Sequence, residues 1–311
     1  MTTTDTPRIG IIGFGEVGSS FARGLREQGA FDILAYDEPP GPRQKELAER
    51  RSVELAVPLL ASPSGFMDRD IVFSSVPQDA ALAAAGFCAP RIGPRPLYVD
   101  VNSLSPAVKR QVAEVVGGAG RDFVDAAIVG MPIRDLHRAQ ILAAGARAEA
   151  FAGLMTPHGM RIQVVGDAPG AAAGIKIVRS LLTKGLEVLL VEALVGARRY
   201  GLTEDIVASF CQLCEERPMR ELLEFLVRSH PVHARRRSLE VAQTVETLEE
   251  AGVEPLMARA VLRRLQETAQ GDYATLVGGV QPATLDDALA VFDRKWGDSR
   301  QDAASAPAVA G

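Results

Sequence analysis

A chain of 311 residues is long enough for two domains that each bury a hydrophobic core. Hydrophobic residues make up 47% of it and charged residues 23%, and a net charge of −5 gives no electrostatic reason to expect nucleic acid or an anionic membrane as a partner. The three cysteines lack the spacing of a zinc site, so no metal is expected. Residues 1–8 contain no signal-peptide core, which favours a cytoplasmic protein.

The first predicted elements are a short apolar strand over residues 9–12 and a helix over residues 19–26, joined by the sequence G-F-G-E-V-G. This order is the fingerprint of a dinucleotide-binding turn, whose glycines permit a tight bend, the approach of a pyrophosphate and close packing of helix on strand. Unpaired N–H groups at the start of the helix then face the phosphates. The residues expected to hold the cofactor in this turn are Gly13, Phe14, Gly15, Glu16, Val17 and Gly18.

A carboxylate, Asp37, ends the next apolar run, nineteen residues beyond Gly18. At this spacing an acid accepts hydrogen bonds from the adenosine ribose of a dinucleotide. Because a carboxylate repels a 2′-phosphate, Asp37 favours NAD, whereas Arg43 and Lys45 shortly afterwards keep NADP possible.

Short apolar runs alternate with helical segments up to residue 168. The pattern predicts strands over 71–75, 97–100, 123–127, 140–144 and 161–165, with a further apolar run over 53–56. Strands spaced by helices indicate parallel β-α-β units, so we expect a doubly wound Rossmann sheet over residues 1–168. Ligands of such sheets bind beyond the carboxyl ends of the strands. The residues expected at that edge are Val76, Pro77, Asn102, Ser103 and the segment Ala126–Gly130.

From residue 169 to residue 297 the pattern predicts an all-helical domain. Its first helix, over 170–199, joins the two domains and is apolar nearly all round, as in a helix buried between domains. Further helices are expected over 204–215, 219–228, 234–251, 255–268 and 284–294, and residues 298–311 are expected to form a flexible tail. A polar stripe on the long helix should face a cleft or a polar network, because burying such groups without partners is costly; the alternative is contact with solvent or another subunit. The stripe consists of Lys176, Ser180, Thr183, Lys184 and Glu187.

Three segments together resemble the β-hydroxyacid dehydrogenase superfamily, which includes 6-phosphogluconate and 3-hydroxyisobutyrate dehydrogenases. They are the fingerprint at 9–18, the sequence D-V-N-S-L-S-P at 100–106, and the lysine segment that runs from Gly170 through Lys176 to Ser180. Within the superfamily the chain is similar to the branch that joins a 6-phosphogluconate-dehydrogenase-type NAD-binding domain to a helical domain of unknown function.

The resemblance implies that Lys176 is the general acid/base of a hydride transfer, with Ser180 and Asn102 beside it. An ammonium desolvated in a cleft has its pKa pulled towards useful values. The alternative is that Lys176 only pairs with a carboxylate at the domain interface. The residues expected to contact substrate are Ser103, Val129, Gly130, Lys184 and Arg236. Ser103 or Ser105 can instead cap a helix, Lys184 can form an ion pair, and Arg236 can belong to a solvated charged face.

Three departures from the family pattern leave the substrate open, the first being that Leu239-Glu240 stands near the position of the family's Lys-Asp pair. Val129 stands where the family has a serine that donates to a carboxylate, and Ser180 stands where it has an asparagine. None of these changes affects the cofactor turn. Two histidines outside any motif, His137 and His158, are expected at the surface.

We therefore expect an NAD(P)-dependent oxidoreductase acting on a small hydroxy acid or its carbonyl partner. The alternatives are an imine reductase-like enzyme, a non-catalytic cofactor-binding protein, and a glycine turn that binds only a mononucleotide. A homodimer is expected, because the helices carry more apolar residues than one short bundle can bury.

Overall fold

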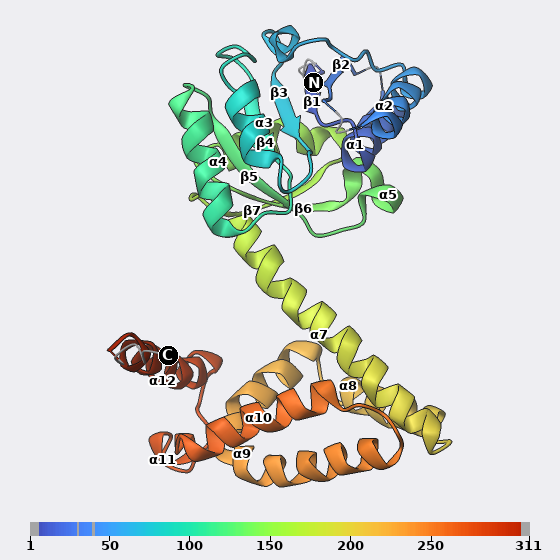
Figure 1. Ribbon diagram of the computed structural model, residues 1–311. Coiled ribbons are helices and arrows are strands. Elements are labelled where there is room, and N and C mark those ends of the chain that lie inside the picture. The colour runs from blue at the N-terminus through green and yellow to red at the C-terminus, as the bar shows by residue number, and fades with distance from the viewer. Residues whose placement is uncertain (1–5, 30, 39–40, 306–311) are drawn as a thin grey trace, which may run out of the picture. The chain divides into compact units, whose positions relative to one another are not determined.

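The structure is a computed structural model, and it describes residues 6–29, 31–38 and 41–305. The chain divides into two compact units, Met1–Leu182 and Thr183–Gly311. The long helix α7 (Ala171–Arg199) contributes its first part to one unit and its remainder to the other (Figure 1).

The first unit contains a seven-stranded sheet in the order β2-β1-β3-β4-β5-β6-β7, which confirms the predicted α/β class. Every neighbouring pair is parallel except β5 with β6. The strands are β1 (Ile9–Ile12), β2 (Ile33–Tyr36), β3 (Ile71–Ser74), β4 (Leu97–Asp100), β5 (Phe123–Ile128), β6 (Gln140–Ala144) and β7 (Arg161–Gly166). The helices are α1 (Glu16–Gln28), α2 (Pro42–Leu55), α3 (Ala81–Cys88), α4 (Pro106–Gly118), α5 (Pro132–Asp135) and α6 (Ala148–Met155), with short 3₁₀ turns η1 (Pro63–Phe66), η2 (Leu136–Arg138) and η3 (Thr156–His158).

The strands β1, β3, β4 and β5 are buried on both faces, which explains their nearly continuous apolar runs. On one face, Phe73 of β3 packs with Phe21 of α1 and Phe151 of α6. On the other face, Val72 of the same strand belongs to a core that includes Val112 of α4. Alternate residues of one strand thus serve two helical layers.

The expectation of uniformly parallel strands is wrong at β6, which runs against β5. Eleven residues, 129–139, separate the two strands, and they form only the short turns α5 and η2. A parallel return needs a crossover of a dozen residues or more, usually through a full helix. The short connection therefore turns the chain straight back.

Two other local expectations need correction. Val53–Ala56 is the last turn of α2 and its αL cap, not a separate apolar segment, and the Val53 side chain is 83% exposed. His137 is buried, not at the surface, and a Cβ added to Gly24 of α1 would lie against its ring. Burial lowers the pKa of His137, assisted by the nearby charge of Arg138. His158 is half-buried and packs edge-on against Phe31.

The second unit is helical, as predicted, and comprises the remainder of α7, then α8 (Thr203–Glu215), α9 (Met219–Glu250), α10 (Leu256–Gln270), α11 (Tyr273–Leu276) and α12 (Leu285–Ser305). The helix α9 is continuous through Pro231, where the sequence pattern predicts a break. Pro231 and Ala234 are buried, and His230 reaches Thr268 of α10 at 3.0 Å. Packing along α10 therefore holds the two predicted halves in one helix in spite of the missing N–H.

The last helix is longer than expected, because α12 continues to Ser305 through residues predicted to belong to a tail. The sequence after Gly297 contains no glycine or proline until Pro307, so nothing in it stops a helix. The rest of that predicted tail, 306–311, lies outside the described residues.

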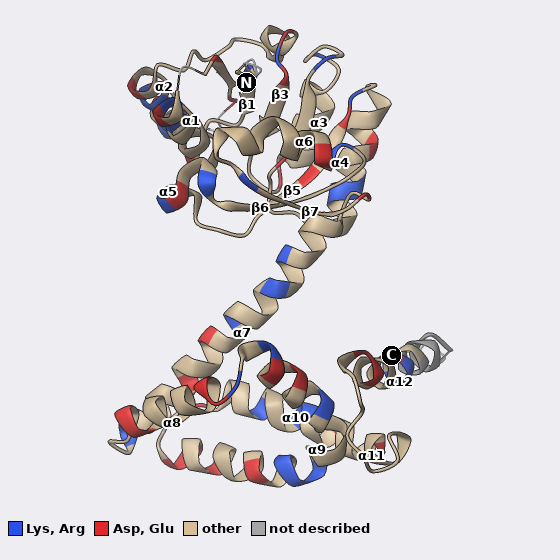
Figure 2. Ribbon diagram, turned by 180° about the vertical axis from the view of Figure 1, so that it is seen from behind, with Lys and Arg blue, Asp and Glu red and all other residues tan. Residues whose placement is uncertain are grey.

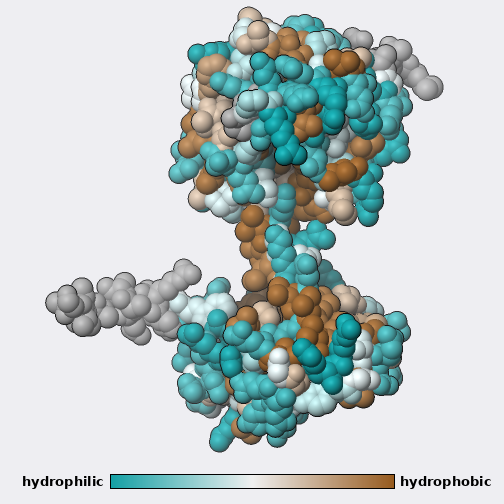
Figure 3. All heavy atoms as spheres, turned by 45° about the vertical axis from the view of Figure 1, so that its right-hand side comes forward, coloured by the Kyte–Doolittle hydropathy of each residue, from teal (hydrophilic) through white to brown (hydrophobic). Residues whose placement is uncertain are grey.

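The composition of α7 predicts a buried helix, but several of its apolar side chains are exposed. Val178 is 67% exposed, Leu181 73% and Leu182 62%. Figure 3 shows apolar side chains along this exposed stretch. In the part of the chain that the structure describes, no helix combines the length and apolarity needed to cross a membrane.

Candidate functional site

The glycine turn has the geometry that a dinucleotide needs. Gly13 has φ +86°, and a Cβ there would lie 2.4 Å from the Ser75 carbonyl oxygen. A Cβ on Gly18 would lie 2.3 Å from the Gly13 carbonyl oxygen, so this glycine allows α1 to pack against the turn. At Gly15, in contrast, nothing lies within 4 Å of the added Cβ. The open space at Gly15 is where a pyrophosphate can approach the backbone.

The start of α1 has the features of an anion-binding helix end. Gly15 is its N-cap residue and no side chain caps the helix, so the N–H groups of the first turn are available. The neighbouring residues predicted to bind the cofactor differ in how accessible their side chains are. The Phe14 side chain is fully buried in the core, so its contacts with a cofactor are limited to the main chain, whereas Glu16 is exposed and Val17 is half-buried.

Asp37 follows β2 directly and is half-buried. Burial raises the pKa of Asp37 above its usual range, while hydrogen bonds with the backbone of Phe14 and Glu38 and the charge of Arg51 partly offset this effect. The Gly13 N–H donates to the carbonyl of Tyr36, the residue before Asp37, at 2.8 Å and so joins this strand end to the glycine turn. The group predicted to receive the ribose therefore lies beside the group predicted to receive the phosphates.

The structure brings the predicted loops together at the carboxyl edge. The hydroxyl of Ser75, after β3, donates to the Gly13 carbonyl at 2.8 Å, and the Val76 N–H donates to Asn102 Oδ1, after β4, at 2.7 Å. Pro77 is exposed beside Val76. Hydrogen bonds thus connect the loops after β1, β3 and β4, as ligand binding across this edge requires.

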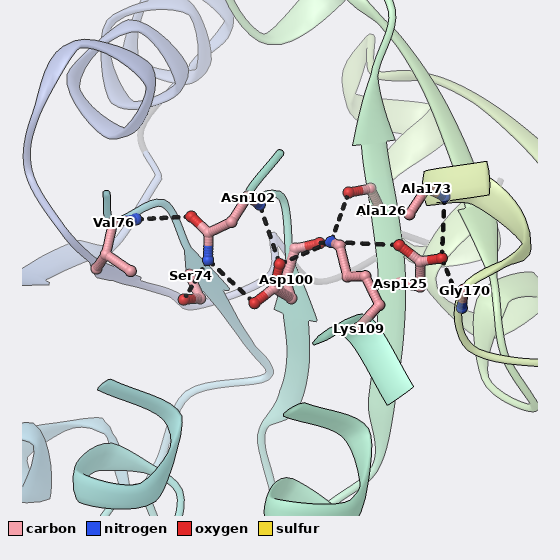
Figure 4. A network of polar contacts seen from close by, with 9 residues as sticks. All are labelled: Ser74, Val76, Asp100, Asn102, Lys109, Asp125, Ala126, Gly170 and Ala173. Atoms are coloured by element: carbon pink, nitrogen blue, oxygen red, sulfur yellow. Dashed lines mark hydrogen bonds and ion pairs between the residues drawn. The ribbon is translucent and has the colours of Figure 1, made fainter. Parts of the chain in front are cut away.

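Asn102 is buried, and its side chain is committed to the protein (Figure 4). Its amide nitrogen donates to Asp100 Oδ2 at 3.0 Å and to Ser74 Oγ at 3.2 Å, so both protons are used. Only an acceptor lone pair on Oδ1 is left for a ligand. The helix α4 is capped by Ser105, which accepts from the Val108 N–H. Ser103 is therefore not needed as the cap, and its side chain is half-buried.

Lys109 is a residue that sequence reasoning missed. It lies in the first turn of α4 and is fully buried. Its Nζ donates to Asp100 Oδ1 at 2.7 Å, to the Asp100 carbonyl at 2.6 Å and to the Ala126 carbonyl at 3.1 Å, and it lies 3.2 Å from Asp125 Oδ1. The available signal was its spacing, because it precedes the core residues Val112 and Val116 by three and seven positions on one helical face.

The beginning of α7 is tied to the sheet by Asp125 (Figure 4). Its Oδ2 accepts from the Gly170 N–H at 2.9 Å and from the Ala173 N–H at 3.1 Å, as a carboxylate does at a helix N-terminus. Ala172 packs with Ala127 of β5. Lys176 follows Ala172 by four residues, so it leaves the helix on the side that faces the sheet, and it is half-buried.

Ser180 lies one turn further along the same side, and its hydroxyl donates to the Lys176 carbonyl at 2.9 Å. Arg179 reaches the carbonyl of Val129 at 3.5 Å. The first half of α7 thus runs past the end of β5, where Val129 is half-buried and Gly130 is exposed. Basic residues follow one another along this helix (Figure 2).

Two predicted substrate residues belong to the second unit. Lys184 is exposed on α7, and Arg236 is exposed on α9, where it forms an ion pair with Glu240 one turn away. A pair of this kind is typical of a solvated helix face.

The comparisons with known proteins agree with this geometry. Residues 8–158 match the NAD binding domain of 6-phosphogluconate dehydrogenase, and residues 197–268 match a domain of unknown function, DUF1932. The conserved protein MTH1747, whose structure is described as similar to 3-hydroxyacid dehydrogenases, is 31% identical, with 88% of this chain and 99% of that chain covered and a TM-score of 0.58. The chain belongs to the family that joins these two domains, and its first unit is an NAD-binding domain.

Other relatives are more distant. The 2-(hydroxymethyl)glutarate dehydrogenase of Eubacterium barkeri is 28% identical over 206 residues, which cover 63% of this chain and 65% of that enzyme. A variant imine reductase from Myxococcus stipitatus, in complex with NAD⁺, has a TM-score of 0.72 at 18% identity and covers 86% of this chain and 95% of its own. At that identity the likeness shows a shared fold. The family and these neighbours are oxidoreductases.

Proposed function

We propose that this protein is an NAD(P)-dependent oxidoreductase that transfers a hydride between nicotinamide and a small hydroxy acid or its carbonyl partner. Lys176 is the general acid/base of the reaction. The observation that carries the proposal is the position of Lys176 on α7, one turn after the Asp125 anchor and on the side facing the sheet. The same edge of the sheet carries the open glycine turn.

The residues that would hold the dinucleotide are those of the glycine turn, with Asp37 at the ribose and Val76 and Pro77 alongside. The cofactor supplies the redox chemistry, since it donates or accepts the hydride. Lys176 takes the proton of the substrate hydroxyl during oxidation or returns it during reduction. Ser180 donates a hydrogen bond to the Lys176 carbonyl and so helps to hold this turn of α7. Ser103, Val129 and Gly130 lie on the loops that would border the substrate, and Lys184 and Arg236 are candidates for an anionic tail.

A substrate panel tests the reaction class. Purified protein with NAD or NADP is assayed by nicotinamide absorbance on hydroxy acids, on the matching carbonyl acids and on cyclic imines. Turnover of the acids supports the proposal. Turnover of imines alone would identify an imine reductase instead, and nicotinamide binding without turnover of any compound would indicate a non-catalytic cofactor-binding protein.

Asp37 should set the cofactor preference. Replacing it with alanine removes charged hydrogen bonds to the ribose and the repulsion of a 2′-phosphate, so we expect NAD affinity to fall by roughly 10–100-fold and NADP affinity to rise. Calorimetric titration of wild type and Asp37→Ala with NAD and with NADP measures the two affinities. Because burial raises the pKa of Asp37, NAD affinity should fall on acidification at a higher pH than an exposed aspartate would cause. An unchanged ratio of the two affinities in Asp37→Ala would contradict the assignment.

The exposed apolar side chains of α7 support a homodimer as the working form. Replacing Leu181, which is 73% exposed, with glutamate should shift a dimer towards monomer, because it puts a charge into the apolar contact. Light scattering measures the change in mass. Val53→Glu is the matched control, since Val53 is as exposed but lies on α2. A monomeric wild-type protein at working concentration would contradict the proposal.

A further inference from the structure

The buried amine of Lys109 lies between two carboxylates that serve different parts of the candidate site (Figure 4). Lys109, Asp100 and Asp125 are all fully buried. Removing three charged groups from water is costly, and hydrophobic residues of similar size usually stabilise a core at least as well. Stability alone therefore does not explain the three charges. A second reason is that each carboxylate forms hydrogen bonds to a different segment beside the candidate site.

Asp100 holds the loop after β4. It accepts from the Asn102 N–H and from the Asn102 side-chain amide, both at 3.0 Å. Asn102 in turn accepts from the Val76 N–H at 2.7 Å, in the loop predicted to run along the cofactor. One side of the Lys109 ammonium thus fixes the two loops that follow β3 and β4.

Asp125 holds the start of α7, through the Gly170 and Ala173 N–H groups. Lys109 uses its three protons on Asp100 Oδ1 and on the carbonyls of Asp100 and Ala126, so its contact with Asp125 Oδ1 at 3.2 Å is held by charge. The positive charge of Lys109 thus faces the carboxylate whose other oxygen accepts from both N–H groups at the start of the helix. Lys176 lies one turn beyond Ala173.

We propose that Lys109 is a positioning residue, which fixes the origin of α7, and with it the Lys176 amine, relative to the Asn102 and Val76 loops. The inference rests on the proposed function of Lys176. Lys109 itself is too deeply buried to touch substrate or cofactor. A displacement of about 1 Å in the reacting groups can lower turnover by roughly 100-fold, so such a link has a measurable effect on kcat.

The first test is kinetic and uses the full chain. Asp125→Asn leaves Lys109 paired with Asp100, and Lys109→Met with Asp125→Asn leaves the net charge of the cluster unchanged. Both variants should lower kcat by roughly 10–100-fold, with the Kd for NADH within about twofold of wild type, since the glycine turn is untouched. Glu192→Gln is the matched control, because Glu192 also holds two N–H groups at a helix start, those of Met257 and Ala258 at 2.8 Å, in the other unit.

The second test does not depend on turnover. The chain has five lysines, so reductive ¹³C-methylation gives a simple NMR spectrum in which Lys176 is assigned by Lys176→Arg. The Lys176 signal should move or broaden in Asp125→Asn and remain unchanged in Glu192→Gln. If the signal and kcat in Asp125→Asn match the wild type, or if NADH binding is lost together with kcat, the positioning role is refuted. If the wild type turns over no substrate, the proposed function fails, and the Lys176 signal alone then decides the inference.

Discussion

Replacing Lys176 with alanine should lower kcat by roughly 10²–10⁴-fold, the range that a positioned acid/base supplies. The Kd for NADH should stay close to the wild-type value, because Lys176 lies on α7 and the cofactor turn lies between β1 and α1. Stopped-flow turnover and fluorescence titration measure the two quantities separately.

Two further variants separate proton transfer from charge. Lys176→Arg keeps the positive charge, but an arginine does not give up its proton at neutral pH, so its kcat should also fall. Added methylamine should restore part of the activity of Lys176→Ala by supplying the missing amine. Turnover close to the wild-type value in Lys176→Ala would exclude the residue as general acid/base.

Two glycine substitutions, Gly13→Ala and Gly15→Ala, should separate folding from cofactor binding. Gly13→Ala combines a strained positive φ with a contact of 2.4 Å to the Ser75 carbonyl, so we expect a loss of about 1–3 kcal/mol in the free energy of unfolding, together with loss of NAD binding. Gly15 has φ −71° and open space around its Cβ, so Gly15→Ala should fold normally. Its NAD affinity should nevertheless fall about tenfold or more, because the methyl group occupies the approach to the backbone.

Denaturant titration measures the free energy of unfolding of both variants, and calorimetry measures their NAD affinity. A Gly15→Ala protein that binds NAD as tightly as the wild type would show that the dinucleotide does not lie over this turn. A Gly13→Ala protein of unchanged stability would show that the Ser75 backbone can move away from the added methyl group.

Much of the sheet was predictable, because β1, β3, β4 and β5 are buried on both faces and therefore appear in the sequence as short apolar runs. β4, predicted at 97–100, has these bounds, and β3 was predicted one residue longer than Ile71–Ser74. The direction of β6 was not predictable from hydrophobicity, since it depends on the length of the connection before it. Pro231 was read as a helix break, and only packing against α10 shows why α9 continues through it.

The candidate site was predictable in part. The glycine turn, Asp37 and Asn102 follow strands, and motif spacing finds such residues. Lys109 carries no motif, and a lysine on a helix is usually a surface residue unless its spacing of three and seven residues to the buried Val112 and Val116 is followed. Asn102 shows the opposite limit, because the sequence can indicate an amide at the edge without showing that Asp100 and Ser74 already use both of its protons.

The reversal of β6 has a consequence for where α7 starts beside the sheet. Since β7 runs parallel to β6 and opposite to β5, the chain leaves the sheet beside Asp125, level with Asp100, and α7 then runs past Val129 in the direction of β5. With a crossover helix between β5 and β6, β7 would run parallel to β5 and end at the same carboxyl edge as β1, β3 and β4, so the next helix would start beyond that edge and not level with Asp125. The eleven-residue connection between β5 and β6 therefore sets the starting point of α7, which begins at Asp125 in the middle of β5 and passes the carboxyl edge along its own length.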